Sequence, residues 1–323
     1  MRRRDLLLAG AALPLAARAQ PAFPDRPLRL VVPFAAGTSS DIQGRLIASR
    51  MGETLGQPVV VENRAGGGGT LGAEAVAKAR PDGHSLLLGS NGPLTVNPVI
   101  QPRMPYDVDT ELAPIALVSR SPLTLAVKAD SPIRSLAELV AAAKAKPGEI
   151  TIGSSGQGSA THFLIEQFMA AAGIRLTHVP YRGSSQSIPD LIAGNVQVVM
   201  GEVSTTTPVW RGGLVRILAT TGLTRSPLVP DVATLIEQGF PGLDGGSWAA
   251  LMTTGGTPEA AIRTLAAAAN AALADPSYQA RQAEVGAQLS EAAVRSPAGL
   301  AAWLREERAR TRATAAQAGI RGE

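Results

Sequence analysis

Residues 28–41 read LRLVVPFAAGTSSD, an apolar run followed at once by a turn of small residues. The run Leu28 to Val32 is predicted to be a strand, and the spacing of Ile42, Leu46 and Met51 marks one apolar face of a helix that follows. The first turn of a helix offers unpaired N–H groups and a partial positive charge, and small residues let a ligand reach the backbone. This junction is therefore a candidate anion site, although a capped turn without a ligand is the alternative. Its candidate residues are Phe34, Ala36, Gly37, Thr38, Ser39, Ser40 and Asp41.

A second junction of the same kind lies in the other half of the chain. Residues 150–161 read ITIGSSGQGSAT, so that a short strand again leads into small residues and a predicted helix. The candidate residues here are Ser154, Gly156, Gly158, Ser159, Ala160 and Thr161. Two such junctions in separate halves predict a carboxylate held in a cleft between two units.

The first 19 residues are predicted to be a secretory signal peptide. They combine the charged start Arg2–Arg4, the short apolar stretch Leu6–Ala17 and an A-x-A signal for cleavage before Gln20. The stretch is too short to span a bilayer core of about 30 Å. Because Arg3–Leu7 resembles a twin-arginine signal, either the general secretory route or the twin-arginine route would carry the chain to the periplasm.

Charge and composition exclude several classes of function. The formal net charge of +4 falls to +1 without residues 1–19, because 26 Lys and Arg then stand against 25 Asp and Glu. No dense basic patch is left, so a nucleic-acid-binding role loses its support. The chain has no cysteine, which excludes disulfides, thiolate metal sites and cysteine nucleophiles. About 300 mature residues usually form two domains.

Strand and helix patterns alternate in two series, an order that predicts parallel sheets covered by helices. The predicted strands are Leu28–Val32, Val59–Glu62 and Ser85–Leu88 in the first series, and Ile150–Ile152, Leu176–Val179, Val196–Met200 and Val215–Thr220 in the second. The apolar runs Ile115–Val127 and Trp248–Met252 are interpreted as crossings between domains. Domain 1 would then comprise 20–123 and 246–323, and domain 2 would comprise 124–245. The region 258–318 is expected to be entirely helical, and one large doubly wound sheet is the alternative architecture.

No catalytic, metal or cofactor site is predicted. The second junction lacks the G-x-G-x-x-G spacing, no Walker-type motif occurs, and no G-x-S-x-G elbow is present. The histidines His84, His162 and His178 have no metal-ligand spacing, so a structural role is favoured for each. The carboxylates are dispersed, without an evident acid and base pair.

Three more residues follow predicted strand ends in the second half. Tyr181 is a candidate to close over a ligand, with Gly183 permitting close backbone approach, and an ordinary turn is the alternative. Glu202 is a candidate to face the cleft and bind a ligand amine, or else to be a solvated carboxylate.

Short motifs along the whole mature chain resemble one family, the periplasmic solute-binding proteins of tripartite tricarboxylate transporters, also called the Bug (Bordetella uptake gene) family. The motifs are RPLRLVVPF (26–34), GQPVVVENR (56–64), PDG (81–83), THVPYRG (177–183), PDV (230–232), GGTP (255–258) and AGI (318–320). The chain departs from the family pattern at Thr38, Glu202 and His84, and the first two changes bear on the identity of the ligand.

The resemblance implies a two-domain periplasmic-binding-protein fold of the Venus flytrap type, type II-like, in which each domain is a mostly parallel sheet flanked by helices. It implies a binding protein without catalysis or cofactor that takes a small carboxylate between the domains. Loops of the first domain, here with Ser90, Asn91 and Gly92 added, would grip the carboxylate, and the second-domain loops would complete the site. A monomer that delivers its solute to membrane permease subunits is expected; a sensor that signals to a membrane receptor and an exported hydrolase or isomerase are the alternatives.

Overall fold

Strand β4 (Leu112–Lys128) organises the molecule, because its two ends pair with different strands. Its first part pairs antiparallel with β9 (Gly246–Thr254). From Leu123 onward it pairs antiparallel with β7 (Val198–Glu202), and it also pairs with β8 (Val215–Thr220). The strand order is β2-β1-β3-β9-β4-β7-β5-β6, so β4 joins a first group of strands to a second.

This computed structural model describes residues 23–181 and 183–320. The predicted signal peptide with its cleavage site and Arg182 of the THVPYRG motif lie outside the described residues. Among the helices that are described, none is long and apolar enough to cross a membrane.

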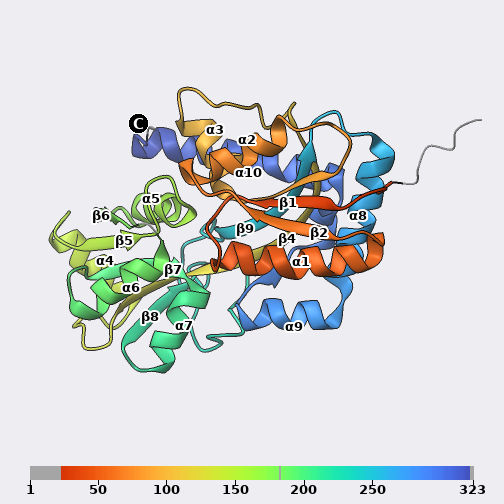
Figure 1. Cartoon of the computed structure of the whole chain (residues 1–323). Helices are drawn as coiled ribbons and strands as arrows, with labels where there is room; N and C mark the ends of the chain where they lie inside the picture. Colours follow the sequence, from red (N-terminus) through yellow and green to blue (C-terminus); the bar gives the residue numbers. More distant parts are fainter. Residues whose placement is uncertain (1–22, 182, 321–323) are drawn as a thin grey trace, which may run out of the picture.

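The first group of strands is covered by helices on both faces, as the right-hand part of Figure 1 shows. Strand β1 (Leu28–Val32) pairs in parallel with both β2 (Val59–Asn63) and β3 (Ser85–Gly89), and β3 pairs antiparallel with β9. Because successive side chains of a strand point to opposite faces, Leu30 and Val31 enter different core clusters. The helices of this group are α1 (Ser39–Leu55), α2 (Thr70–Ala77), α8 (Glu259–Ala274), α9 (Pro276–Glu284) and α10 (Pro297–Ala318).

The second group of strands has its own core clusters. Strand β5 (Thr151–Ser154) lies between β6 (Thr177–Pro180) and β7 and is parallel to both. Phe168 and Met200 lie in the cluster on one face, and Val199 lies in the cluster on the other. The helices here are α4 (Leu136–Ala145), α5 (Ala160–Ala172), α6 (Ser184–Ala193) and α7 (Val203–Arg211).

Several elements differ from the sequence-based expectation. Each group is mixed rather than mostly parallel, because β9, β8 and β4 pair antiparallel with their neighbours. The expectation of an entirely helical C-terminal region is wrong, since β10 (Gln288–Leu289) pairs with β4. Helix α7 was not predicted, because its threonines and an internal proline disfavour helix; hydroxyls of Thr206 and Thr207 bond back to carbonyls one turn earlier. The helical stretch formed by η2 (Gly92–Val96) and α3 (Asn97–Ile100) was also missed.

Strand β4 changes partners between Pro122 and Leu123, and β9 begins at Gly246. The predicted division into two domains that move as units remains a prediction.

Candidate functional site

The first junction is held in shape by one buried carboxylate. Asp41 is 4% exposed and accepts hydrogen bonds from the Gly37 amide (2.9 Å), Arg45 Nε (3.1 Å) and Asn63 Nδ2 (3.0 Å). These donors hold the pKa of Asp41 below its usual value, although burial opposes them. The carboxylate thus fastens the loop after β1 to the end of β2, and both of its oxygens are engaged.

The turn itself is exposed and ends in a capped helix. Thr38 is the N-cap of α1, and its hydroxyl accepts from the Asp41 amide (3.4 Å). Ser39 and Ser40 are the first two residues of the helix, and their amides have no acceptor among the described residues. Gly37 has a φ of 80°, which L side chains rarely adopt, so glycine suits this turn.

The second junction repeats this arrangement at α5. Ser159 is the N-cap and accepts from the His162 amide (3.2 Å), while the amides of Ala160 and Thr161 have no acceptor within the described residues. The Thr161 hydroxyl is 2.8 Å from the Ser159 hydroxyl and accepts from the Ser155 amide at the same distance. Ser154 is fully buried, with its hydroxyl 2.6 Å from Nε2 of His178. In both helices the cap hydroxyl accepts from the amide of the third residue, and the amides of the first two residues have no acceptor among the described residues.

The third loop is held by Asn91. Its side-chain amide donates to the Gly246 carbonyl (3.1 Å), and its oxygen accepts from the Trp248 amide (3.2 Å). A Cβ on Gly92 would lie 2.4 Å from the Gly68 carbonyl oxygen, so a side chain has no room there. Asn91 and Gly92 thus define how this loop packs on β9 and on the turn before α2.

Glu202 ends β7 and is bonded to the same segment of β9. The Ser247 hydroxyl donates to Glu202 Oε1, and Ser247 lies between the two residues that Asn91 holds. Burial raises the pKa of Glu202 to about 7, and the Ser247 hydrogen bond only partly opposes this. No ion pair of Glu202 occurs among the residues that the structure describes. Glu202 is half-buried, and no cation lies beside its carboxyl among the described residues, so its two alternatives, facing a ligand or meeting solvent, both remain predictions.

Tyr181 is engaged within the second group. Its hydroxyl donates to Asp190 Oδ2 of α6 (2.7 Å), and its ring lies 3.1 Å from the position of a Cβ on Gly153. Burial raises the pKa of the Tyr181 hydroxyl to about 12, and the hydrogen bond with Asp190 adds to the effect. Gly183 directly precedes α6.

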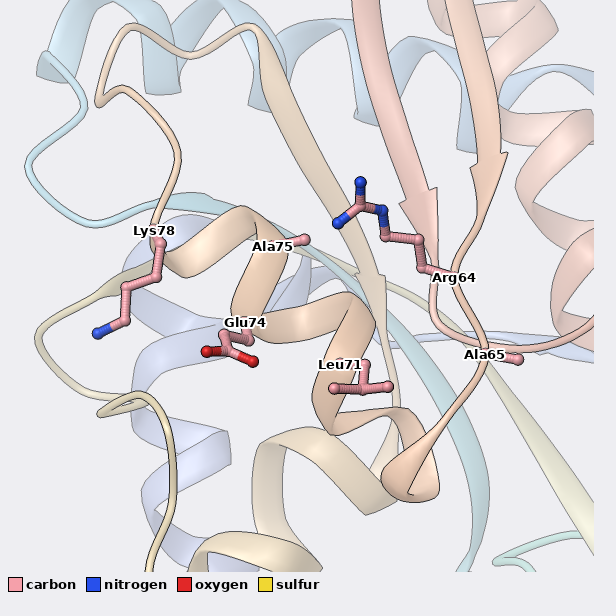
Figure 2. A pocket seen from close by; sticks show the side chains of 6 residues that line it. All are labelled: Arg64, Ala65, Leu71, Glu74, Ala75 and Lys78. Carbon is pink, nitrogen blue, oxygen red and sulfur yellow. The ribbon is translucent and has the colours of Figure 1, made fainter.

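The structure brings some of the predicted residues close together, but the depression that it forms beside α2 is lined by other residues. Asn91 and Glu202 bond to adjacent residues of the same segment of β9, Gly246 to Trp248. A Cβ on Gly158 would touch Ile100 of α3 at 3.2 Å, so the second junction lies against that helix. Figure 2 shows a depression between α2 and the loop after β2. It is lined by Arg64, Ala65, Leu71, Glu74, Ala75 and Lys78, none of which was a candidate. Within the described residues no cluster of three or more metal-ligating side chains occurs.

Sequence reasoning missed the residues that hold the loops. Ser247 lies in no motif. Asn63 lies in the GQPVVVENR motif directly after the predicted strand Val59–Glu62, and this position beside the first junction is the signal that could have identified it. The sequence favours a structural role for His178 but does not indicate its contact with Ser154.

Comparisons with known proteins identify the family and the fold. The family model described as a tripartite tricarboxylate transporter family receptor matches residues 44–314. A Pseudomonas sp. protein from the tcbD-tcbE intergenic region is 40% identical over 279 residues, covering 84% of this chain and 83% of that protein. The periplasmic binding protein BugD has a solved structure with a TM-score of 0.80 and 33% identity, covering 93% of this chain and 100% of BugD. The structure of a Rhodopseudomonas palustris protein with adipate has a TM-score of 0.82 and 33% identity, covering 93% of this chain and 99% of that protein. These likenesses confirm the predicted two-domain fold class.

Proposed function

Since this chain belongs to the tripartite tricarboxylate transporter receptor family, we propose that it captures a small carboxylate between its two groups of strands and delivers it to the permease of such a transporter. The family consists of periplasmic solute-binding proteins, and the chain is one of them rather than an enzyme. The carboxylate, the permease and the monomeric state are parts of the proposal. Export by a cleaved signal of the secretory or twin-arginine type is part of it too.

The observation that carries the proposal is the pair of matched helix starts. The unpaired amides of Ser39 and Ser40 at α1, and of Ala160 and Thr161 at α5, are donors of the kind that bind carboxylates at helix ends. A hydrogen bond to a charged group is worth about 1.5–3 kcal/mol, and the helix dipole adds about 0.3–1 kcal/mol at each end. A carboxylate that reached both ends would therefore hold the two groups together.

Closure of the two groups around the solute follows from this arrangement. We place the hinge where β4 changes partners and where β9 begins, with 20–123 and 246–323 moving against 124–245. The adipate in the Rhodopseudomonas palustris structure supports a carboxylate as the ligand class.

A thermal denaturation screen tests the proposal. Protein freed of any co-purified ligand by unfolding and refolding is heated with a panel of mono-, di- and tricarboxylates that includes adipate. A ligand that binds only the folded state stabilises it by about 2.7 kcal/mol at a hundred times its Kd, which raises Tm by several degrees. Mass spectrometry of the material released on unfolding identifies the natural solute. A protein that gives no shift with any carboxylate, and that releases none, would refute the proposal.

A further inference from the structure

Two histidines form a stacked pair directly behind the second junction. His162 lies on α5 and His178 on β6, with ring centroids 4.1 Å apart and ring planes 8° from parallel. His162 is 4% exposed. Neither ring takes part in the proposed carboxylate contacts.

Each ring makes a hydrogen bond to the loop between β5 and α5. The Gly158 amide donates to Nδ1 of His162 (3.1 Å), so this nitrogen carries no proton. Nε2 of His178 lies 2.6 Å from the Ser154 hydroxyl, which in turn accepts from the Gly156 amide (3.1 Å). The two rings thus hold the loop near its start and near its end.

The surroundings of the pair contain little charge. Glu166, one turn along α5, has an oxygen 3.6 Å from Nε2 of His162. The strand β5 beside His178 has no charged residue between Thr151 and Ser154, and α10 meets α5 through a hydrogen bond from Gln167 to Thr314. Apart from the rings themselves, Glu166 is the charged group that acts on His178.

We propose that His162 and His178 are positioning residues that keep the second junction in its binding shape only while both rings are neutral, so that acid opens the loop. A proton on Nδ1 of His162 removes the acceptor of the Gly158 amide, and a proton on His178 places a cation against a buried ring. The effect on carboxylate capture rests on the proposed function, whereas the effect on the loop does not.

The sign follows from the titration of His178. Burial, aided by His162, lowers its pKa to about 4, and Glu166 opposes this. An exposed histidine titrates near about 6.5, so the open loop binds more protons than the closed loop below that pH. Opening is therefore expected to rise by up to about tenfold per pH unit between about 6.5 and 4.

Hydrogen exchange of the purified protein without ligand tests the inference. The exchange rates of residues 154–162 are divided by the intrinsic rates and compared between about pH 7.5 and pH 4.5, with residues 34–42 as the internal reference. We expect the normalised rates to rise about tenfold to a hundredfold in acid, and only in residues 154–162. The double variant His162→Asn with His178→Gln keeps an amide group near each bonding nitrogen and cannot titrate, so its loop should stay protected in acid. His178→Gln alone serves if the double variant does not fold, because the expected pH dependence comes from His178.

Two results would overturn the inference: protection of 154–162 that does not depend on pH, or a variant that loses protection in acid as the natural chain does. Titration with adipate at the same two pH values measures whether acid also weakens carboxylate binding. Failure of every carboxylate to bind at neutral pH would refute the proposed function, while the exchange data would still decide the inference about the loop.

Discussion

Replacing Ser39 with proline is expected to weaken carboxylate binding while leaving α1 intact. Proline has no N–H and is well suited to the first position of a helix, which Ser39 occupies. The residue before a proline must be extended, and Thr38 already has φ −75° and ψ 163°. The Thr38 cap does not depend on the Ser39 amide, because it accepts from Asp41. The substitution therefore removes one donor of the proposed site and little else.

The expected magnitude is that of one charge-assisted hydrogen bond. Such a bond contributes about 1.5–3 kcal/mol, which corresponds to about tenfold to a hundredfold in Kd. Ala160→Pro makes the same change at α5, where the preceding Ser159 has φ −77° and ψ 164°. The two variants should weaken binding to a similar degree if one ligand contacts both helix ends.

Isothermal titration with adipate, or with whichever carboxylate raises Tm most, measures the loss. Ser39→Ala is the matched control, because it removes the hydroxyl and its contact with Gln43 Nε2 (3.3 Å) but keeps the amide. Thermal denaturation without ligand establishes that each variant is folded. A Ser39→Pro protein that binds within about twofold of both Ser39→Ala and the natural chain would refute the assignment of this helix end to the ligand.

Three further changes follow from the same contacts. Glu202→Gln should make stability less dependent on pH. Because the pKa of Glu202 is raised in the folded state, its ionisation lowers the free energy of unfolding by up to about 3 kcal/mol as pH rises from about 4.5 through 7. The variant should therefore have a higher Tm than the natural chain above neutral pH and a similar Tm in acid. Asp41→Asn exchanges a carboxylate acceptor for a group with one acceptor oxygen and should cost about 1–3 kcal/mol in urea denaturation, with an unchanged m-value. Gly92→Ala should cost about 1–3 kcal/mol in the same assay, because its methyl group would clash with the Gly68 carbonyl.

The strands and the two helix starts could be predicted because they depend on local sequence. The apolar run Leu28–Val32 is buried on both faces and has the pattern of a strand. Thr38 and Ser159 are of the residue types that cap helices, and each stands immediately before its helix. Helix α7 could not be predicted, since its threonine run favours strand until tertiary packing overrides it. The two residues of β10 form a strand only because β4 offers a free edge there, which no local pattern records.

The loops named as the candidate site remain a prediction, and the sequence did not indicate which protein atoms their side chains bond to. Asn91 was expected to contact ligand, yet both of its side-chain atoms bond to β9, and the partner of Glu202 on that strand is separated from it by 45 residues of chain. Hydrogen-bond partners this far apart in the sequence are brought together by the tertiary fold, which residue type and local spacing do not determine.

The engaged side chains also explain why the motifs indicate a carboxylate without naming the solute. Asp41, Asn91, Thr161 and Tyr181 all bond to protein atoms, and turning one toward a ligand would leave a polar group unpaired at a cost of about 1–3 kcal/mol. If a carboxylate binds at the junctions as proposed, its recognition falls to backbone amides, which suit any carboxylate equally well. We infer that selectivity resides in groups that reach the rest of the solute. Glu202 is the first of them to test, because it is half-buried, has one oxygen bonded to Ser247 and has no cation beside it in the described chain. A solute that brought a hydrogen-bond donor or a positive charge to that carboxyl would relieve its burial, whereas one that brought a second carboxylate would have to bring a proton as well.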